Sequence, residues 1–373
     1  MKHSLRLGRV AGVPVGVHWS VLVIGALIGV SLGAVVLPEA APGRPAVLYA
    51  LTAAVAAVLF LGSLLAHELA HALVALVRGV QVRSITLWLL GGVAELEGEA
   101  PTPRHELETA AAGPLTSLAC AALSFVAAVL LPGPDLVVAA LTWLALMNAM
   151  LGVFNLLPGA PLDGGRVLHA VVWRVTRSRT RADRAAAIGG QALGMALIAF
   201  GIAEIFLLSW SGGLWILIIG WFLVSAAKGE YVAATARRGL GGVPVRDVVT
   251  GPPEVAPAWL TIEDFAAATA LRSHQTAYVV VDFEGRPIGY LSLDAMAALS
   301  PRARAVTRVS DLTRPVPPDN VVTPDEEASV LVTKRPLPGQ VVAFVVDGGH
   351  VVGVVTAADL NRMLRQAMLR QAA

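Results

Sequence analysis

Long apolar stretches recur along the first 230 residues of this chain and limit what it can fold into. A helix that crosses the hydrocarbon core of a bilayer needs about 20 predominantly apolar residues. Stretches of roughly that kind occur at Val15–Leu37, Val47–Val77, Leu107–Leu131, Leu136–Leu157, Ala185–Leu208 and Gly213–Ala227. With 56% hydrophobic and 14% charged residues, the composition is also far from that of a soluble protein. The sequence therefore predicts an integral membrane protein with about six spans.

Basic residues are distributed unevenly between the two sides of these spans. The connections 38–45, 132–135 and 209–212 hold a single basic residue, Arg44. The opposite side carries Lys2, Arg6, Arg9, Arg78, Arg83, Arg174, Arg177, Arg179, Arg181, Arg184, Lys228, Arg237 and Arg238. By the positive-inside rule we expect both termini of this multi-pass protein in the cytoplasm. Scarce lysine beside abundant Arg, Ala, Gly and Val hints at a bacterial source, so we expect a bacterial cell membrane. The net charge of +2 and the lack of a Lys/Arg stripe argue against a nucleic-acid partner.

A shorter apolar segment between the second and third spans contains a turn signal. Ser84–Leu90 is followed by Gly91-Gly92 and then by Val93–Leu96, which is typical of a β-hairpin. Non-helical backbone at membrane depth is tolerated only where it is buried in protein or lines a water-filled cavity. We therefore predict a membrane-depth β-hairpin that borders a polar site. It could hold an unwound substrate strand by β-augmentation, with Gly91 and Gly92 as the substrate-binding positions.

After residue 238 the sequence pattern becomes that of a soluble α/β protein. We assign residues 1–238 to a membrane-embedded domain and residues 243–373 to a soluble domain, with a linker at 239–244. The soluble part contains two similar units of about 60 residues, at about 243–300 and 306–365. Each is expected to form an apolar strand, a turn, a second strand and a short helix.

The chemistry is concentrated in His67-Glu68-Leu69-Ala70-His71, which has the HExxH pattern. On a helix, two histidines at i and i+4 share one face and can bind the same Zn²⁺, and the glutamate can act as general base. In a soluble protein this short pattern often arises by chance. Here it lies inside a predicted span, where each ionisable residue costs roughly 2.5–3.5 kcal/mol and so indicates a function.

A catalytic zinc usually has three protein ligands, and the helix supplies two. The best candidate for the third is Asp163, because two prolines and three glycines in 155–165 loosen the end of the fourth span. The alternative for this Asp-Gly pair is an ordinary turn at the membrane interface.

Together, HExxH on one span and Asn155-Leu156-Leu157-Pro158 with Leu162-Asp163-Gly164 on a later one resemble the site-2 protease family of intramembrane metalloproteases. The resemblance covers about residues 1–230 and includes Gly113-Pro114. It implies that His67, His71 and Asp163 bind one zinc per chain, that Glu68 is the general base, and that Asn155 stabilises the oxyanion or orients the substrate. It further implies a membrane protein substrate, such as a membrane-bound regulator of transcription.

The soluble part resembles a tandem CBS-domain pair, which also occurs in one branch of that family. The resemblance implies an adenine nucleotide held by Thr356 and Asp359, and a homodimer formed through the CBS domains. In the first repeat Asp294 arrives one residue early, so the second repeat fits a nucleotide pocket better. The alternative is that Thr356 and Asp359 form only a helix capping box.

Two other functions remain open at this stage. A metal-ion transporter could use a related HExPH pattern, but Ala70 replaces the proline and only Asp163 offers a further ligand on another span. A nucleotide-sensing scaffold with a vestigial protease site is the third reading. His169 has no partner pattern and is expected at the surface.

Overall fold

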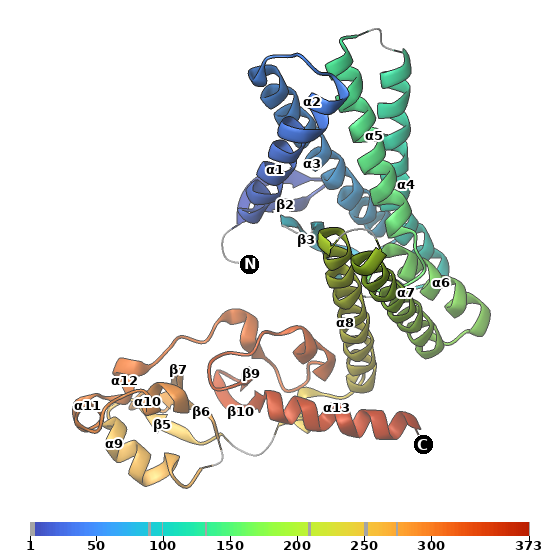
Figure 1. Cartoon of the computed structure of the whole chain (residues 1–373). Coiled ribbons are helices and arrows are strands. Elements are labelled where there is room, and N and C mark those ends of the chain that lie inside the picture. Colours follow the sequence, from blue (N-terminus) through green and yellow to red (C-terminus); the bar gives the residue numbers. More distant parts are fainter. Residues whose placement is uncertain are drawn as a thin grey trace. The chain divides into compact units, whose positions relative to one another are not determined.

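The computed structural model of the chain describes residues 4–88, 91–98, 100–130, 133–207, 210–249, 253–273 and 275–372 (Figure 1). The chain divides into two compact units, Met1–Tyr231 and Val232–Ala373.

Six helical segments among the described residues are long and apolar enough to cross a bilayer. They are α1 (Ser20–Ser31) with its π-helical extension Leu32–Val36 and α2 (Leu37–Ala40), then α3 (Ala46–Val77), α4 (Pro103–Leu130), α5 (Asp135–Asn155), α7 (Arg179–Leu207) and α8 (Trp210–Leu240). Large apolar side chains on them are exposed, such as Leu22 at 71% and Phe206 at 82%. An apolar exterior on helices of this length suits lipid, and the expected six spans are confirmed.

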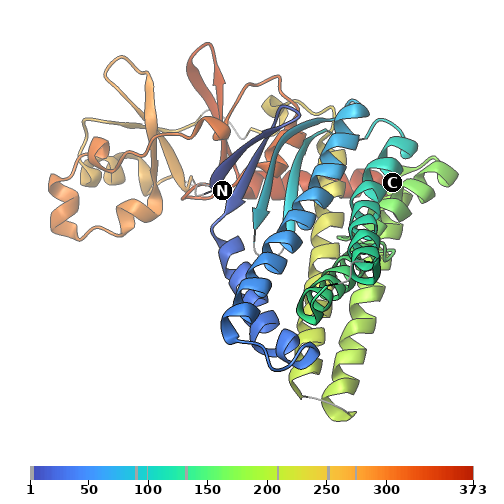
Figure 2. The same ribbon diagram turned by 90° about the horizontal axis from the view of Figure 1, so that it is seen from above.

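A four-stranded sheet accompanies these helices, in the order β1 (Ser4–Val10), β2 (Val13–His18), β3 (Gln81–Trp88) and β4 (Gly91–Glu97). Strands β3 and β4 form the expected hairpin, whose residues 89 and 90 lie outside the described part. The sheet lies beside α3, which contacts both β3 and β4 (Figure 2).

The start of the first span was predicted too early, at Val15. Residues Val13–His18 are a strand that pairs antiparallel with β1 and parallel with β3, and the helix begins at Ser20. Val13 and Val15, two residues apart, are both 3% exposed, as a strand requires. That period of two is hidden inside an apolar run that continues into the span.

Short helix α6 (Asp163–Thr176) connects α5 to α7 and packs against α4 and α7. Helices α7 and α8 approach each other through glycines. A Cβ at Gly194 would lie 2.7 Å from the Gly220 carbonyl oxygen, and one at Gly201 would lie 2.8 Å from that of Gly213. Small residues of this kind let helix backbones pack closely within a membrane.

The second unit repeats one topology twice. One sheet has the order β5 (Val255–Pro257), β6 (Ala277–Val281), β7 (Pro287–Ser292), and the other β8 (Val321–Val322), β9 (Val341–Asp347), β10 (His350–Thr356). In both, an antiparallel hairpin is joined by one short parallel strand. The helices are α9 (Ile262–Phe265), α10 (Leu293–Ala297), α11 (Pro301–Val306), α12 (Val309–Leu312) and α13 (Ala357–Ala372), and the shorter turns are Val245–Asp247, Ala266–Ala270, Pro318–Asn320 and Ala328–Thr333.

A shared core joins the two repeats. Val279 and Tyr290 of the first repeat pack with Val341 and Phe344 of the second, all at most 3% exposed. The expected α/β repeat architecture is thus confirmed. The region predicted as a linker, 239–244, is partly helical because α8 continues to Leu240.

Candidate metal centre

Three potential metal ligands converge between α3 and α6. His67 and His71 lie one turn apart on α3, and Asp163 is the first residue of α6. The Nε2 atoms of the two histidines are 3.2 Å apart, and each is 3.2 Å from Asp163 Oδ2. Both histidines are buried. Among the described residues, this is the cluster of His, Cys, Asp and Glu that could hold a metal ion.

Helix α4 orients the two imidazole rings. His71 Nδ1 lies 2.7 Å from the carbonyl oxygen of Thr109, and His67 Nδ1 lies 2.9 Å from Ser117 Oγ. Because a carbonyl oxygen only accepts, His71 donates from Nδ1, which in the neutral ring leaves the Nε2 lone pair facing the cluster. Histidine ligands of metals are commonly oriented in this way, through a hydrogen bond at the second ring nitrogen.

Gly113 lies on α4 midway between Thr109 and Ser117. The spacing of four places all three residues on one face of the helix. A Cβ at Gly113 would lie 2.1 Å from His71 Nε2 and 2.6 Å from His67 Nε2. A residue without a side chain is therefore required at this position.

The donor set fits zinc. In the neutral ring the Nε2 lone pair of His71 faces a second imidazole nitrogen and a carboxylate oxygen at 3.2 Å, and a bound cation would offset the repulsion among the three atoms. A tetrahedral zinc with ligand distances of about 2.0–2.1 Å has ligand–ligand edges of roughly 3.3–3.4 Å, close to the observed separations. Three protein ligands would leave the fourth position open to water or substrate.

Glu68 lies next to His67 on α3 and packs against strand β4. A Cβ at Gly92 would lie 2.1 Å from Glu68 Cγ and 2.8 Å from Glu68 Oε1. The predicted hairpin position Gly92 and the predicted general base are therefore neighbours. Gly91 opens β4 with φ of 133°, a conformation that favours glycine.

The loop before α6 is held by backbone contacts that bring Asp163 to α3. Ala160 N donates to the Ala186 carbonyl of α7 over 3.0 Å. A Cβ at Gly190 would lie 1.9 Å from the Ala160 oxygen, and one at Gly165 would lie 2.4 Å from Ala160 N. Gly165, one of the glycines that loosen this part of the sequence, and Gly190 of α7 thus permit close packing.

Asn155 is placed differently from the other predicted site residues. It is the last residue of α5, and its Nδ2 donates to the Leu151 carbonyl over 3.0 Å. In the described part of the chain, no hydrogen bond joins its amide to His67, His71 or Asp163. Its second N–H remains available to an oxyanion, so its role stays a prediction.

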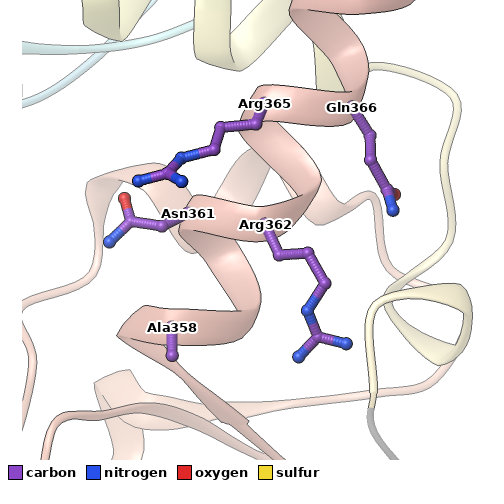
Figure 3. A pocket seen from close by; sticks show the side chains of 5 residues that line it. All are labelled: Ala358, Asn361, Arg362, Arg365 and Gln366. Atoms are coloured by element: carbon purple, nitrogen blue, oxygen red, sulfur yellow. The ribbon is translucent and has the colours of Figure 1, made fainter.

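The predicted nucleotide residues form a capping box at the start of α13. Asp359 Oδ2 accepts from Thr356 N over 3.0 Å and from Thr356 Oγ1 over 2.7 Å, and Asp359 N donates to Thr356 Oγ1. Arg362 also contacts the Asp359 carboxylate. A pocket of about 430 Å³ lies along this helix, lined by Ala358, Asn361, Arg362, Arg365 and Gln366 (Figure 3).

The two residues that orient the histidines, and the burial of a further histidine on α6, were not predicted from the sequence. One sequence signal could have indicated Thr109 and Ser117: small or polar residues recur every four positions in an otherwise apolar helix. His169 was expected at the surface, which is wrong. Its side chain is 14% exposed and contacts Glu106 and Asp183, residues 63 and 14 positions away that no local pattern connects to it.

Comparison with known proteins identifies the family. Residues 55–137 and 133–200 match Peptidase family M50. The chain is 43% identical over 375 residues to Rip3 of Mycobacterium tuberculosis, whose name assigns it to the zinc metalloproteases, covering all of this chain and 95% of that one. It is 25% identical over 377 residues to the zinc metalloprotease MJ0392 of Methanocaldococcus jannaschii, covering 100% of this chain and 99% of that one.

Two solved structures also match parts of the chain. The site-2 protease from Methanocaldococcus jannaschii is 26% identical, covering 61% of this chain and 95% of that one, with a TM-score of 0.42. The CBS domain of a bacterial CNNM/CorC family Mg²⁺ transporter in complex with ATP is 21% identical, covering 37% and 97%, with a TM-score of 0.31. On the identity and coverage of the Mycobacterium relative, this integral membrane protein belongs to peptidase family M50, the zinc metalloproteases of the site-2 protease type.

Proposed function

We propose that this metalloprotease hydrolyses a peptide bond in or near the transmembrane segment of another membrane protein. The observation that carries the proposal is the 3.2 Å triangle of His67 Nε2, His71 Nε2 and Asp163 Oδ2, which lies between the membrane-spanning helix α3 and helix α6. His67 lies ten residues before the end of α3 at Val77. At 1.5 Å per residue that is about 15 Å of helix, and His71 lies about 9 Å from the same end, so both histidines are within the apolar helix.

In this proposal His67, His71 and Asp163 hold one zinc ion. Bound zinc would supply a Lewis acid that polarises the scissile carbonyl and makes the attacking water more acidic. Glu68 accepts the proton of that water and then donates it to the leaving amine nitrogen. Glu68 lies beside the proposed ligands and against Gly92, a position from which it can reach both the attacking water and the substrate.

Strand β4 is the proposed docking edge for the substrate. It is the last strand in the sheet order, so one of its edges has no neighbouring strand among the described residues. A helical substrate must unwind before its carbonyls can be attacked, because they are engaged in its own hydrogen bonds. Pairing with β4 would replace those bonds and hold the chain beside Gly92 and Glu68. From the family resemblance, we propose a membrane-bound regulator of transcription as the substrate.

The test measures zinc and cleavage separately in the full-length protein. Wild type and Glu68→Gln should both retain about one zinc per chain, but only wild type should cleave reconstituted single-span membrane proteins. Asp163→Ala should lose both properties, whereas Asp135→Ala, at a carboxylate that is 80% exposed, should lose neither. Stoichiometric zinc in Asp163→Ala, or cleavage by Glu68→Gln at the wild-type rate, would contradict the assignment.

We further propose that the soluble unit binds an adenine nucleotide beside α13 and thereby regulates the protease. Arg362 and Arg365 line the pocket there, and guanidinium groups bind phosphate well. The helix starts directly after β10, and a helix N-terminus also favours anions. Asp359 would have to exchange its contact with Arg362 for ribose hydroxyls.

Titration of the full-length protein with ATP, ADP and AMP tests this regulation. Arg365→Ala should weaken saturable binding while leaving the capping box intact, and Asp359→Ala should weaken it as well. Asp347→Ala, at an exposed carboxylate on β9, is the matched control. If no nucleotide binds at millimolar concentration, the unit is better explained as a module for homodimerisation, the other role proposed for it.

A further inference from the structure

A second cluster of ionisable side chains lies along α6, away from the metal centre. The His169 ring is held between two carboxylates, with Nδ1 2.9 Å from Glu106 Oε2 and Nε2 3.0 Å from Asp183 Oδ1. The side chains of all three residues are less than 20% exposed. Each ring nitrogen therefore lies within hydrogen-bonding distance of a carboxylate oxygen, which accepts. His169 bridges two acidic side chains.

The three members of this cluster come from three helices. Glu106 is on α4, His169 on α6 and Asp183 on α7. Helix α6 packs against both α4 and α7 (Figure 1). One side chain thus joins α6 to both of its neighbours. Two short contacts from one ring to two different helices restrict rotation and sliding of α6.

The same helices position the candidate zinc ligands. Glu106 precedes Thr109 by one turn on α4, and the Thr109 carbonyl accepts from His71. At its other end the bridge acts on α6, whose first residue is Asp163. The turn of α4 that orients one ligand therefore also anchors the helix that carries another.

His169 is too distant along α6 to join the ligands itself. Six residues from Asp163 correspond to about 9 Å of rise and to a different face of the helix. Both of its ring nitrogens are also engaged by carboxylates. Any effect on the metal centre must act through the position of the helix.

We propose that His169, bridging Glu106 and Asp183, is a positioning residue that sets the Asp163 carboxylate against His67 and His71. The inference rests on the proposed role of Asp163 as a zinc ligand. Loss of the bridge frees α6 to shift, so the three ligand atoms no longer hold their 3.2 Å spacing.

The test measures the zinc affinity of the full-length protein by competition with a chelator, together with its melting temperature. His169→Gln should weaken zinc affinity by about 10-fold or more, in the range seen when groups that orient metal ligands are removed. Glu106→Gln keeps an acceptor for Nδ1 and should have a smaller effect. Arg174→Ala, at an exposed residue of the same helix, is the control and should leave zinc affinity unchanged.

A double-mutant cycle separates positioning from general stability. If His169 acts through Asp163, His169→Gln should have almost no further effect on zinc affinity in an Asp163→Ala background. A lower melting temperature with wild-type zinc affinity in His169→Gln, or additive losses in the double mutant, would overturn the inference alone. Wild-type zinc affinity in Asp163→Ala would instead overturn the proposed ligand set, and this inference with it.

Discussion

Gly113→Ala is the substitution whose effect on the metal centre follows most directly from the structure. The added Cβ would lie 2.1 Å from His71 Nε2 and 2.6 Å from His67 Nε2. Non-bonded heavy atoms pack at roughly 3.5 Å, so the closer contact is short by about 1.4 Å. Either α4 moves away from α3 or both imidazole rings turn.

Both responses break the hydrogen bonds that orient the ligands. The bonds at risk are those of His71 Nδ1 with the Thr109 carbonyl, at 2.7 Å, and of His67 Nδ1 with Ser117 Oγ, at 2.9 Å. Loss of one such partner typically costs 10–100-fold in metal affinity. We therefore expect Gly113→Ala to weaken zinc binding by at least about 100-fold, or about 2.7 kcal/mol.

Zinc content after dialysis and competition with a chelator would measure this loss, with circular dichroism reporting whether the helices persist. The matched control is Gly62→Ala on α3, where a Cβ would meet no atom within 4 Å. It should bind zinc like wild type and be slightly more stable, because alanine favours a helix over glycine. A folded Gly113→Ala protein with zinc affinity within threefold of wild type would refute the reasoning.

Three further predictions concern the base, the loop that carries Asp163 and the topology. Gly92→Ala places a Cβ 2.1 Å from Glu68 Cγ, so it should retain zinc but cleave about 100-fold more slowly; an unchanged rate would contradict the placement of Glu68. Gly190→Ala places a Cβ 1.9 Å from the Ala160 oxygen and should lower stability by about 1–3 kcal/mol in thermal unfolding, while Gly229→Ala, in open space, should not. Reporter fusions at Ser178 and at the C-terminus should both report the cytoplasm, and an external C-terminal reporter on an active protein would exclude the proposed orientation.

The membrane spans were predictable because their signal is local. A bilayer requires about 20 apolar residues in one helix, and that requirement can be counted along the chain. Their ends were less predictable. Helix α8 continues from the predicted end at Ala227 to Leu240, since charged residues end an apolar stretch without ending a helix. Whether Val13–His18 belonged to the first span depended on its partner strand, Ser4–Val10.

The soluble repeats were predictable for a related reason. Each repeat presents two apolar strands around a polar turn, and the pattern occurs twice in the sequence. The short parallel strands β5 and β8 were not foreseen, because two or three residues carry too little pattern. The role of Thr356 and Asp359 stays a prediction, and their capping box shows that one spacing can serve two purposes.

At the metal centre, the spacing of residues along the chain is enough to predict which of them share a helix face. The spacing of His67 and His71 guarantees that their rings lie on one side of α3 wherever the helix is placed, and Glu68 follows between them. The packing of α3 against α4 and α6 decided the rest. Asp163 approaches both histidines from 96 and 92 residues away, and Thr109 sets which nitrogen of His71 faces the centre. Helical spacing is a property of neighbouring residues, whereas the direction of a lone pair depends on atoms that only the tertiary structure brings into contact.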